Sequence, residues 1–381
     1  MEERKSSTQQ KLEERDIPPS SITEFRNKYY KEIDDKQWQD WQWQLKNRIT
    51  TRKELERFIE LRKEEIVFLE YTNNTFSITP YYMMLVLHSE AIRKCVIPTQ
   101  DELIISEGES IDPLCEEKTN PVKCIVHRYS DRVLFLTTDF CSSKCRYCTR
   151  SRIIDHDNKF HNRDNWQQAI NYIKENSQIR DVIISGGDPL TLSKTDLRFI
   201  LDQLYDIDHV DIIRIGTKIP VVLPQRIDKE LLGVLDLYWQ KLFINIHWTH
   251  PLEITDYSKE ACLKLTRLGI PLGSQTVLLK DVNDNIETMK FLMQGLLKCK
   301  VIPRYLYSMD RIQGSKHFFV PIEKGKKIIK GIQGHTSGMA CPKYVIDSSL
   351  GKIPVDIGYT EKIDTNIYKL TNYQGKELVY K

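Results

Sequence analysis

Hydrophobic residues along positions 132–306 follow two alternating patterns. Short runs rich in β-branched residues recur, and each run predicts a strand. The predicted strands are 133–138, 181–185, 210–215, 242–246, 274–279 and 301–306. Between and after these runs, apolar residues recur every three or four positions, as they do on one face of a helix. The predicted helices are 165–176, 194–205, 228–239, 256–268, 284–298 and 322–333.

This alternation indicates an α/β protein built from strand–helix–strand units with a parallel sheet. Six such strands can form either an open doubly wound sheet or a partial barrel. Both architectures bind ligands on the loops that follow the C-terminal ends of the strands. We therefore expect any chemistry of this chain to reside on those loops.

The N-terminal third has a different pattern. Trp38, Trp41, Leu45 and Ile49 recur at three- and four-residue steps and predict one helix, and a second helix is expected to begin at Thr51. An irregular connection is predicted over 97–124. The expected organisation is then a disordered tail (1–21), a helical region (22–126), an α/β core (127–335) and a short β-containing C-terminal segment (336–381).

Composition and charge exclude several classes of protein. With 40% hydrophobic and 29% charged residues, the chain is not wholly disordered. Its 56 basic and 53 acidic residues give a net charge of +3, which indicates no nucleic-acid partner. We recognise no secretion signal and no apolar stretch of spanning length. We therefore expect a cytoplasmic protein without a membrane partner.

Three of the nine cysteines lie close together, directly after the first predicted strand. Cys141, Cys145 and Cys148 are separated by four and three positions, so their thiolates can converge on one inorganic centre. Structural zinc usually takes four protein ligands in two pairs, and no fourth Cys or His lies at a comparable short spacing. An iron–sulfur cube held by three cysteines leaves one iron open to a small molecule. The spacing favours the iron–sulfur cube.

This spacing resembles the signature of the radical S-adenosylmethionine (SAM) superfamily, in which the open iron binds SAM and one electron cleaves it to a 5′-deoxyadenosyl radical. Further motifs are spread along the chain: HRYSDRV (127–133), CSSKCRYCTR (141–150), SGGD (185–188), IPVVLPQRI (219–227), HWTHPLEIT (247–255), QTVLLKDVND (275–284), YSMD (307–310) and GHTSG (334–338). Through these motifs, and over most of residues 25–375, the chain resembles the lysine 2,3-aminomutase family.

The resemblance implies a partial (β/α)6 radical SAM barrel with three cofactors: a [4Fe-4S] cluster on the three cysteines, SAM, and pyridoxal 5′-phosphate (PLP). SAM is expected to contact Ser185, Gly186, Gly187, Asp188, His247 and Gln275. PLP is expected to form a Schiff base with Lys352, which follows a shorter glycine run than the family's aminomutases have. Its phosphate is expected near Arg128, Tyr129 and Arg132, with Tyr307 near PLP and SAM.

The resemblance also implies a substrate and a reaction. Arg150 is expected to bind the substrate α-carboxylate, and Asp310 and Asp347 to bind the ε-ammonium of lysine. Two acids in one pocket repel each other unless a cation lies between them, so glutamate is not expected to be the substrate. The expected activity is interconversion of L-lysine and L-β-lysine by 5′-deoxyadenosyl-radical 1,2-amino migration.

The expected partners are a free amino acid and an electron donor such as flavodoxin or ferredoxin. Three alternatives stay open. One is action on a protein-bound lysine of elongation factor P, another is action on arginine, and the third is a non-enzymatic zinc-binding protein. The sequence also leaves open whether the chain forms a homo-oligomer.

Overall fold

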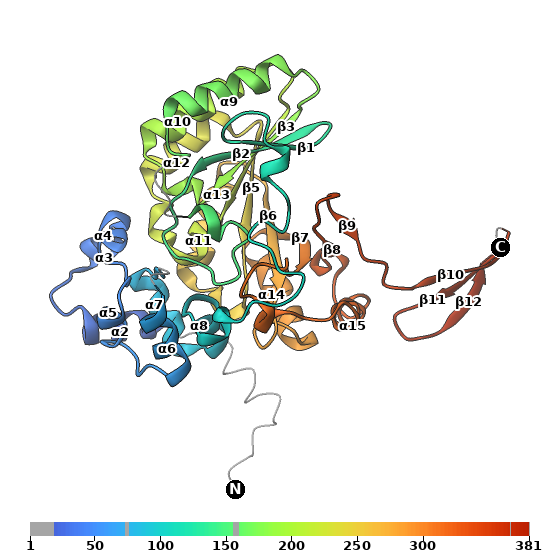
Figure 1. Ribbon diagram of the computed structural model, residues 1–381, viewed down its shortest axis with the longest axis horizontal. Coiled ribbons are helices and arrows are strands. Elements are labelled where there is room, and N and C mark those ends of the chain that lie inside the picture. The colour runs from blue at the N-terminus through green and yellow to red at the C-terminus, as the bar shows by residue number, and fades with distance from the viewer. Residues whose placement is uncertain (1–18, 73–75, 155–159, 366, 381) are drawn as a thin grey trace, which may run out of the picture.

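The structure is a computed structural model that describes residues 19–72, 76–154, 160–365 and 367–380 (Figure 1). Its centre is a nine-stranded sheet in the order β1 to β9. All six strands predicted for the core are confirmed. They are β2 (Arg132–Thr138), β3 (Asp181–Gly186), β4 (Ile212–Thr217), β5 (Leu242–His247), β6 (Leu272–Leu278) and β7 (Val301–Ser308).

All six predicted core helices are also confirmed. They are α9 (Arg163–Glu175), α10 (Lys194–Tyr205), α12 (Lys229–Leu235), α13 (Asp256–Arg267), α14 (Ile286–Lys298) and α15 (Ile322–Ile332), with the short α11 (Ile219–Val222) between β4 and α12. In α9 the residues Trp166, Ala169, Ile170 and Ile173 are buried, which is the three- and four-residue spacing that predicted the helix. Short 3-10 turns complete the core: η3 (Ser151–Ile153), η4 (Pro189–Thr191), η5 (Pro224–Arg226), η6 (Asp236–Tyr238), η7 (Pro251–Glu253), η8 (Lys316–Phe318) and η9 (Gly338–Ala340).

Strand order decides between the two predicted architectures. The strands β2 to β8 lie side by side in sequence order and are all parallel. In a doubly wound sheet, the order of the strands would instead reverse at one point within the sheet. The sheet is therefore a partial barrel. Along β3, Val182 and Ile184 are fully buried, while Ile183 and Ser185 line the central cavity, so alternate side chains face opposite sides.

The barrel has a seventh parallel strand that the sequence did not predict as part of the core. This strand, β8 (Lys343–Ile346), pairs with β7 through Tyr305 and Lys343. It was missed because four residues are too few to establish a hydrophobic period. Its position carries residues 347–352 to the same end of the barrel as the other strand ends.

The two edges of the sheet approach each other at the mouth of the barrel. The edge strands β1 (Ile125–Tyr129) and β9 (Ile353–Pro354) are each antiparallel to their neighbours. Arg128 Nη1 donates a hydrogen bond of 2.8 Å to the carbonyl of Ser348. The backbone N–H of Lys352 donates one of 2.9 Å to the Tyr129 hydroxyl. Within the described chain, side chains rather than a strand ladder close the barrel here.

The N-terminal region is helical, but its predicted helices are wrong in detail. Its helices are α2 (Pro19–Tyr29), α3 (Asp35–Gln39), α4 (Trp41–Lys46), α5 (Arg52–Leu55), α6 (Lys63–Tyr71), α7 (Pro80–His88) and α8 (Glu90–Val96). The single helix predicted from Trp38 to Ile49 is split at Asp40, whose side chain caps α4 by accepting from Gln42 N–H at 2.9 Å. Thr51 caps α5 as predicted, but that helix ends after one turn.

The predicted tail and connection have different outcomes. Residues 1–18 of the tail lie outside the described residues, and residues 19–21 begin α2 instead. The irregular connection over 97–124 is confirmed, because the structure gives it only the 3-10 turns η1 (Gln100–Leu103) and η2 (Glu117–Thr119) as helical elements. None of the described helices is long and apolar enough to cross a bilayer.

The C-terminal residues form a second, small sheet. Its strands β10 (Thr360–Asp364), β11 (Ile367–Thr371) and β12 (Glu377–Tyr380) are antiparallel, as expected of a short β-containing segment. The sheet projects from the barrel as an arm (Figure 1). It takes no part in the cavity described next.

Candidate active site

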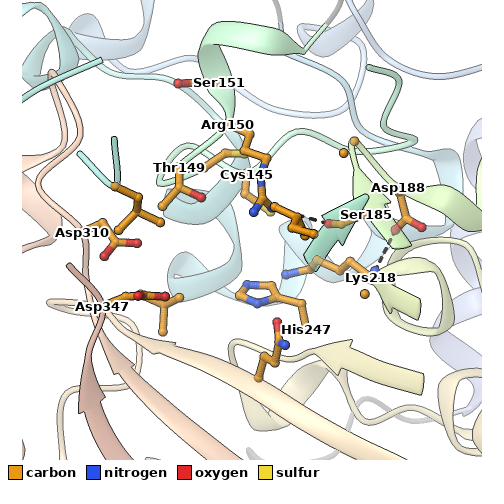
Figure 2. A pocket seen from close by; sticks show the side chains of 18 of the residues that line it. Cys145, Thr149, Arg150, Ser151, Ser185, Asp188, Lys218, His247, Asp310 and Asp347 are labelled. Carbon is orange, nitrogen blue, oxygen red and sulfur yellow. Dashed lines mark hydrogen bonds between the residues drawn. The ribbon is translucent and has the colours of Figure 1, made fainter. Parts of the chain in front are cut away.

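A cavity of about 1020 Å³ occupies the barrel at the C-terminal ends of its strands. Every residue to which the sequence gave a role lines this cavity. In Figure 2, Asp310 and Asp347 lie on one side, Arg150 and Cys145 lie near the centre, and Ser185, Asp188 and Lys218 lie opposite the acids. Residues from the ends of β2, β3, β4, β7 and β8 are thus brought together, as a barrel predicts.

The cysteine loop is held in place by the N-terminal helical region. After β2 the chain turns so that Lys144 N–H donates to the carbonyl of Ser77 at 3.0 Å. Arg146 N–H donates to the carbonyl of Cys95 at 2.9 Å. These two backbone bonds fix both sides of the loop, so the helical region supports the proposed cluster site.

The thiol groups of this loop need a cationic partner before they can ionise together. Burial, and then the neighbouring Cys145, raise the pKa of Cys148 to about 11. Among the described residues, no group of three His, Cys, Asp or Glu side chains is arranged to hold a single metal ion. A cube has a different requirement, because each cysteine binds a different iron. The donor set therefore fits an iron–sulfur cluster.

The two glycines of the SGGD motif allow β3 to contact the cysteine loop closely. Gly186 has φ of +121°, and a Cβ added there would lie 2.2 Å from the carbonyl oxygen of Thr138. A Cβ added at Gly187 would lie 2.2 Å from the carbonyl oxygen of Phe140. The resemblance implies that both glycines contact SAM. Both line the cavity, but their lack of a side chain is required by the loop backbone.

Replacing Gly187 with alanine is expected to destabilise the protein by about 3 kcal/mol, because the new methyl group would overlap a backbone carbonyl. Gly233 in α12 provides a matched control, since a Cβ there meets no atom within 4 Å. Gly233→Ala is expected to stabilise the helix by about 0.5–1 kcal/mol. Urea unfolding midpoints measure both effects, and equal stability of the two variants would contradict the close contact.

Asp188 joins the ends of two strands instead of presenting a free carboxylate. Its Oδ1 accepts from Thr217 Oγ1 at 2.6 Å, and its Oδ2 accepts from Lys218 N–H at 2.7 Å, the bond drawn in Figure 2. Burial raises the pKa of Asp188 to about 6, although these hydrogen bonds oppose the rise. Both oxygens have protein partners, so Asp188 positions the loop between β3 and β4.

A buried polar network missed by the sequence analysis lies beside the cysteine loop. Lys218 Nζ donates to Thr249 Oγ1 at 2.9 Å and forms an ion pair with Glu253 at 3.0 Å. The hydroxyl of Tyr147 lies 2.8 Å from Thr249 Oγ1 and 2.8 Å from His247 Nε2. The signal available in the sequence was a lysine three positions after the end of the third predicted strand.

His247 and Gln275 are neighbours on the cavity wall. His247 is the last residue of β5 and pairs in register with Gln275 of β6. Burial, and then the charge of Lys218, lower the pKa of His247 to about 3. The imidazole is therefore neutral near pH 7 and can take part in hydrogen bonds without adding charge to the cavity.

Two carboxylates at the ends of neighbouring strands lie on the same side of the cavity (Figure 2). Asp310 follows β7 and Asp347 follows β8. Burial, and then Asp347, raise the pKa of Asp310 to about 7. Lys352 Nζ lies 3.3 Å from Asp347 Oδ2 and 5.6 Å from the ring centre of Tyr307. The pair therefore forms an anionic site that attracts an ammonium group.

The short turn before Lys352 is sufficient to direct its side chain inward. Ser348 and Gly351 close the turn through reciprocal backbone hydrogen bonds of 3.1 and 2.9 Å. Gly351 has φ of +104°, which favours glycine at this position. A single glycine is thus enough to form the turn, although the family's aminomutases have a longer glycine run, and the Lys352 amine reaches the cavity.

The three residues predicted near the PLP phosphate differ in how many of their hydrogen-bond donors are already used by other groups of the protein. Arg128 donates to the carbonyls of Ser348 and Leu114, and within the described part of the chain its buried Nε has no hydrogen-bond partner. Arg132 lies over the Tyr129 ring, with its guanidinium carbon 3.9 Å from the ring centre. An unpaired buried N–H beside a second arginine and a hydroxyl fits a phosphate.

Comparison with known proteins defines the class first. The sequence pattern of the Radical SAM superfamily matches residues 135–292, so the chain is a radical SAM protein. It is 42% identical to an L-lysine 2,3-aminomutase of Fusobacterium nucleatum over 93% of this chain and 85% of that protein. An L-lysine 2,3-aminomutase of Clostridium subterminale is 41% identical over 93% of this chain and 87% of that protein.

A glutamate 2,3-aminomutase of Clostridioides difficile is also similar, with 40% identity over 90% of this chain and 82% of that protein. The chain belongs to the lysine 2,3-aminomutase family of radical SAM enzymes. It is accordingly an aminomutase, and the alternative of a non-enzymatic zinc-binding protein is wrong. Family membership implies a [4Fe-4S] cluster and SAM.

Proposed function

We propose that this protein is a PLP-dependent L-lysine 2,3-aminomutase that interconverts L-lysine and L-β-lysine by 5′-deoxyadenosyl-radical 1,2-amino migration. The observation that carries the proposal is the pair of carboxylates, Asp310 and Asp347, in the same cavity as Arg150 and the three cysteines. Overall identity does not choose the substrate, since relatives named for lysine and for glutamate are 42% and 40% identical.

Charge makes lysine a better substrate than glutamate. Asp347 already helps to raise the pKa of Asp310, so a third carboxylate beside them would be repelled. A lysine ε-ammonium between them would instead pair with both. At the other end of the substrate, the Arg150 guanidinium provides a planar group that pairs with an α-carboxylate. Two charged ends of opposite sign therefore match the two ends of lysine.

The remaining residues are assigned by their chemistry. When bound, the cluster and SAM supply a carbon radical that removes hydrogen from an unactivated C–H bond, and PLP supplies a conjugated system that stabilises an unpaired electron. Cys141, Cys145 and Cys148 would hold the cluster. Lys352 would bind PLP, and Arg132 and Tyr129 would hold its phosphate, with one further donor from Arg128 Nε.

Several parts of the SAM site follow the same assignment. Ser185, Gln275 and neutral His247 present polar groups to the cavity without adding charge, which suits a zwitterionic cofactor. Tyr307 also lines the cavity, and its ring centre lies 5.6 Å from Lys352 Nζ, which suits a position near PLP. A one-electron donor such as flavodoxin or ferredoxin, the cytoplasmic location and the four-part division of the chain remain predictions.

Anaerobic reconstitution with iron, sulfide, PLP and SAM tests the proposal directly. The loaded protein is incubated with lysine, arginine, glutamate and a lysine-containing elongation factor P, and the β-amino acids formed are quantified. We expect β-lysine from free lysine at a rate well above that of the other three. Turnover of arginine or of the protein-bound lysine in its place would replace the proposed substrate.

Replacing Lys352 with alanine is expected to remove the visible absorbance of PLP bound to the protein, because no other amine would take its position. Lys343→Ala is the control, since this exposed lysine lies on the preceding strand, β8. The control should keep the absorbance band and bind PLP in equimolar amount. Retention of the band in Lys352→Ala would assign PLP to a different lysine.

A further inference from the structure

The irregular connection contributes a charged residue to the site that neither the sequence motifs nor the proposed function accounts for. Glu116 lies just before η2, its side chain is only 5% exposed, and it lines the same cavity as Arg150. We propose that Glu116 is a positioning residue that holds the Arg150 guanidinium for the carboxylate of the substrate. This inference rests on the proposed function, because it assumes an α-amino acid substrate.

Glu116 binds two arginines at once. Its Oε1 accepts from Arg150 Nη2 at 2.8 Å, and its Oε2 accepts from Arg152 Nη2 at 3.1 Å. Burial alone would raise the pKa of Glu116, but the two guanidinium groups outweigh it and keep the pKa below its usual value. Glu116 is therefore ionised and acts as a fixed negative charge between two positive ones.

Arg150 has N–H donors that Glu116 does not use. A guanidinium has five N–H donors, and Glu116 takes one of them. A second, on Nη1, reaches Ser185 Oγ only at 3.4 Å, which is a weak hydrogen bond. The Nε is buried and has no hydrogen-bond partner among the residues that the structure describes. Arg150 thus lies near the centre of the site (Figure 2) with donors still available for a carboxylate.

The backbone around Glu116 is fixed before any ligand arrives. Asp112 accepts from the backbone N–H of Glu116 at 3.1 Å and pairs with Arg152 at 3.2 Å. Cys115 has φ of 52°, a conformation that residues other than glycine rarely adopt, so the chain turns sharply before Glu116. These contacts make Glu116 part of a rigid turn.

The same segment is attached to two other walls of the cavity. The carbonyl of Leu114 accepts from Arg128, which belongs to the wall proposed for the PLP phosphate. Backbone bonds of 2.9 and 3.1 Å connect Ser110 with Arg311 and Gln313, in the loop that carries Asp310. Glu116 therefore fixes Arg150 relative to both the cofactor wall and the acid pair.

Loss of the Glu116 charge would remove the carboxylate that holds Arg150 at 2.8 Å. Arg152 would keep its ion pairs with Asp112 and Glu117. Because the attraction to Glu116 is lost, Arg150 would move out of alignment with the substrate. The effect is confined to ligands that carry a carboxylate, because only those use Arg150. This requirement separates a positioning role from a purely structural one.

The test compares Glu116→Gln with Glu117→Gln, which removes the same charge from the neighbouring side chain, 74% exposed. Binding of L-lysine and of L-lysinamide, which lacks the carboxylate, is measured by calorimetry on PLP-loaded protein without SAM. We expect Glu116→Gln to weaken lysine binding at least tenfold and lysinamide binding less than twofold. Glu117→Gln should change neither by more than twofold.

A third variant covers failure to fold. Glu116→Asp keeps the charge but shortens the side chain, and it should weaken lysine binding less than Glu116→Gln does while leaving lysinamide binding unchanged. The positioning role would be overturned if either variant lost affinity for lysine and for lysinamide equally. It would also be overturned if Glu116→Gln lost no affinity for lysine. If the wild-type protein binds a different α-amino acid instead of lysine, the proposed function fails, and the same comparison with that amino acid and its amide decides the role of Glu116.

Discussion

Cys145→Ala is expected to lose its bound iron and to cleave no SAM, because the cube then has two protein ligands in place of three. Radical formation has no substitute among ordinary side chains, so turnover of lysine should fall by more than about 10⁴-fold. Iron and acid-labile sulfide contents of anaerobically reconstituted protein measure the first effect. Formation of 5′-deoxyadenosine measures the second.

Cys341→Ala is the matched control for this experiment. Cys341 is half-buried, follows η9 and does not line the cavity, so its loss should leave iron, sulfide and turnover unchanged. Stoichiometric iron in Cys145→Ala would mean that another residue completes the ligand set. Zinc without iron in the wild-type protein would remove the basis for radical chemistry.

Asp310→Asn is expected to lower kcat/KM for lysine by roughly 10²–10³-fold, the cost of removing one member of a buried charge pair in a complex. Asp310 is the more informative acid to replace, because Asp347 also contacts Lys352 at 3.3 Å. The exposed Asp236 on η6 is a control whose change to asparagine should leave kcat/KM within twofold. A loss below threefold in Asp310→Asn would show that the acid pair does not bind the substrate ammonium.

The pH profile of the same two proteins gives an independent measurement of this site. Burial and Asp347 raise the pKa of Asp310 to about 7, so the carboxyl group of the free enzyme is mostly protonated below that pH and ionised above it. Only the ionised form attracts a cation, so wild-type kcat/KM for lysine should rise between pH 6 and pH 8. Asp310→Asn cannot ionise at this position, and its profile should lack that rise.

The sequence predicted the core because its elements are set by local patterns. The six strands and six helices each carry enough apolar residues to define a period of two or of 3.6. The strand β8 does not, since its place in the sheet depends on pairing with β7 through Tyr305 and Lys343. The N-terminal helix was predicted as one because Trp38 and Leu45 fit one stripe, although Asp40 between them caps a new helix.

The site was less predictable where its members meet through tertiary contacts. Motif residues such as Cys145 and Lys352 were named from resemblance, and they line one cavity. Glu116 was not named, because it lies in a segment without periodicity and meets Arg150 34 positions later in the chain. The glycine Gly187 was identified, but its physical reason is contact with the Phe140 carbonyl, which only coordinates reveal.

The way in which the barrel edges meet bears on how large ligands can enter it. The edges at β1 and β9 are joined by two hydrogen bonds, from Arg128 to Ser348 and from Lys352 to Tyr129. In a closed barrel, a ladder of backbone hydrogen bonds would join the two edges along their whole length. Each such bond contributes only about 1 kcal/mol net. Separating these two edges therefore requires less free energy than separating two paired strands of the barrel. Separation of these two edges would admit PLP from the side of the barrel, next to the lysine proposed to bind it.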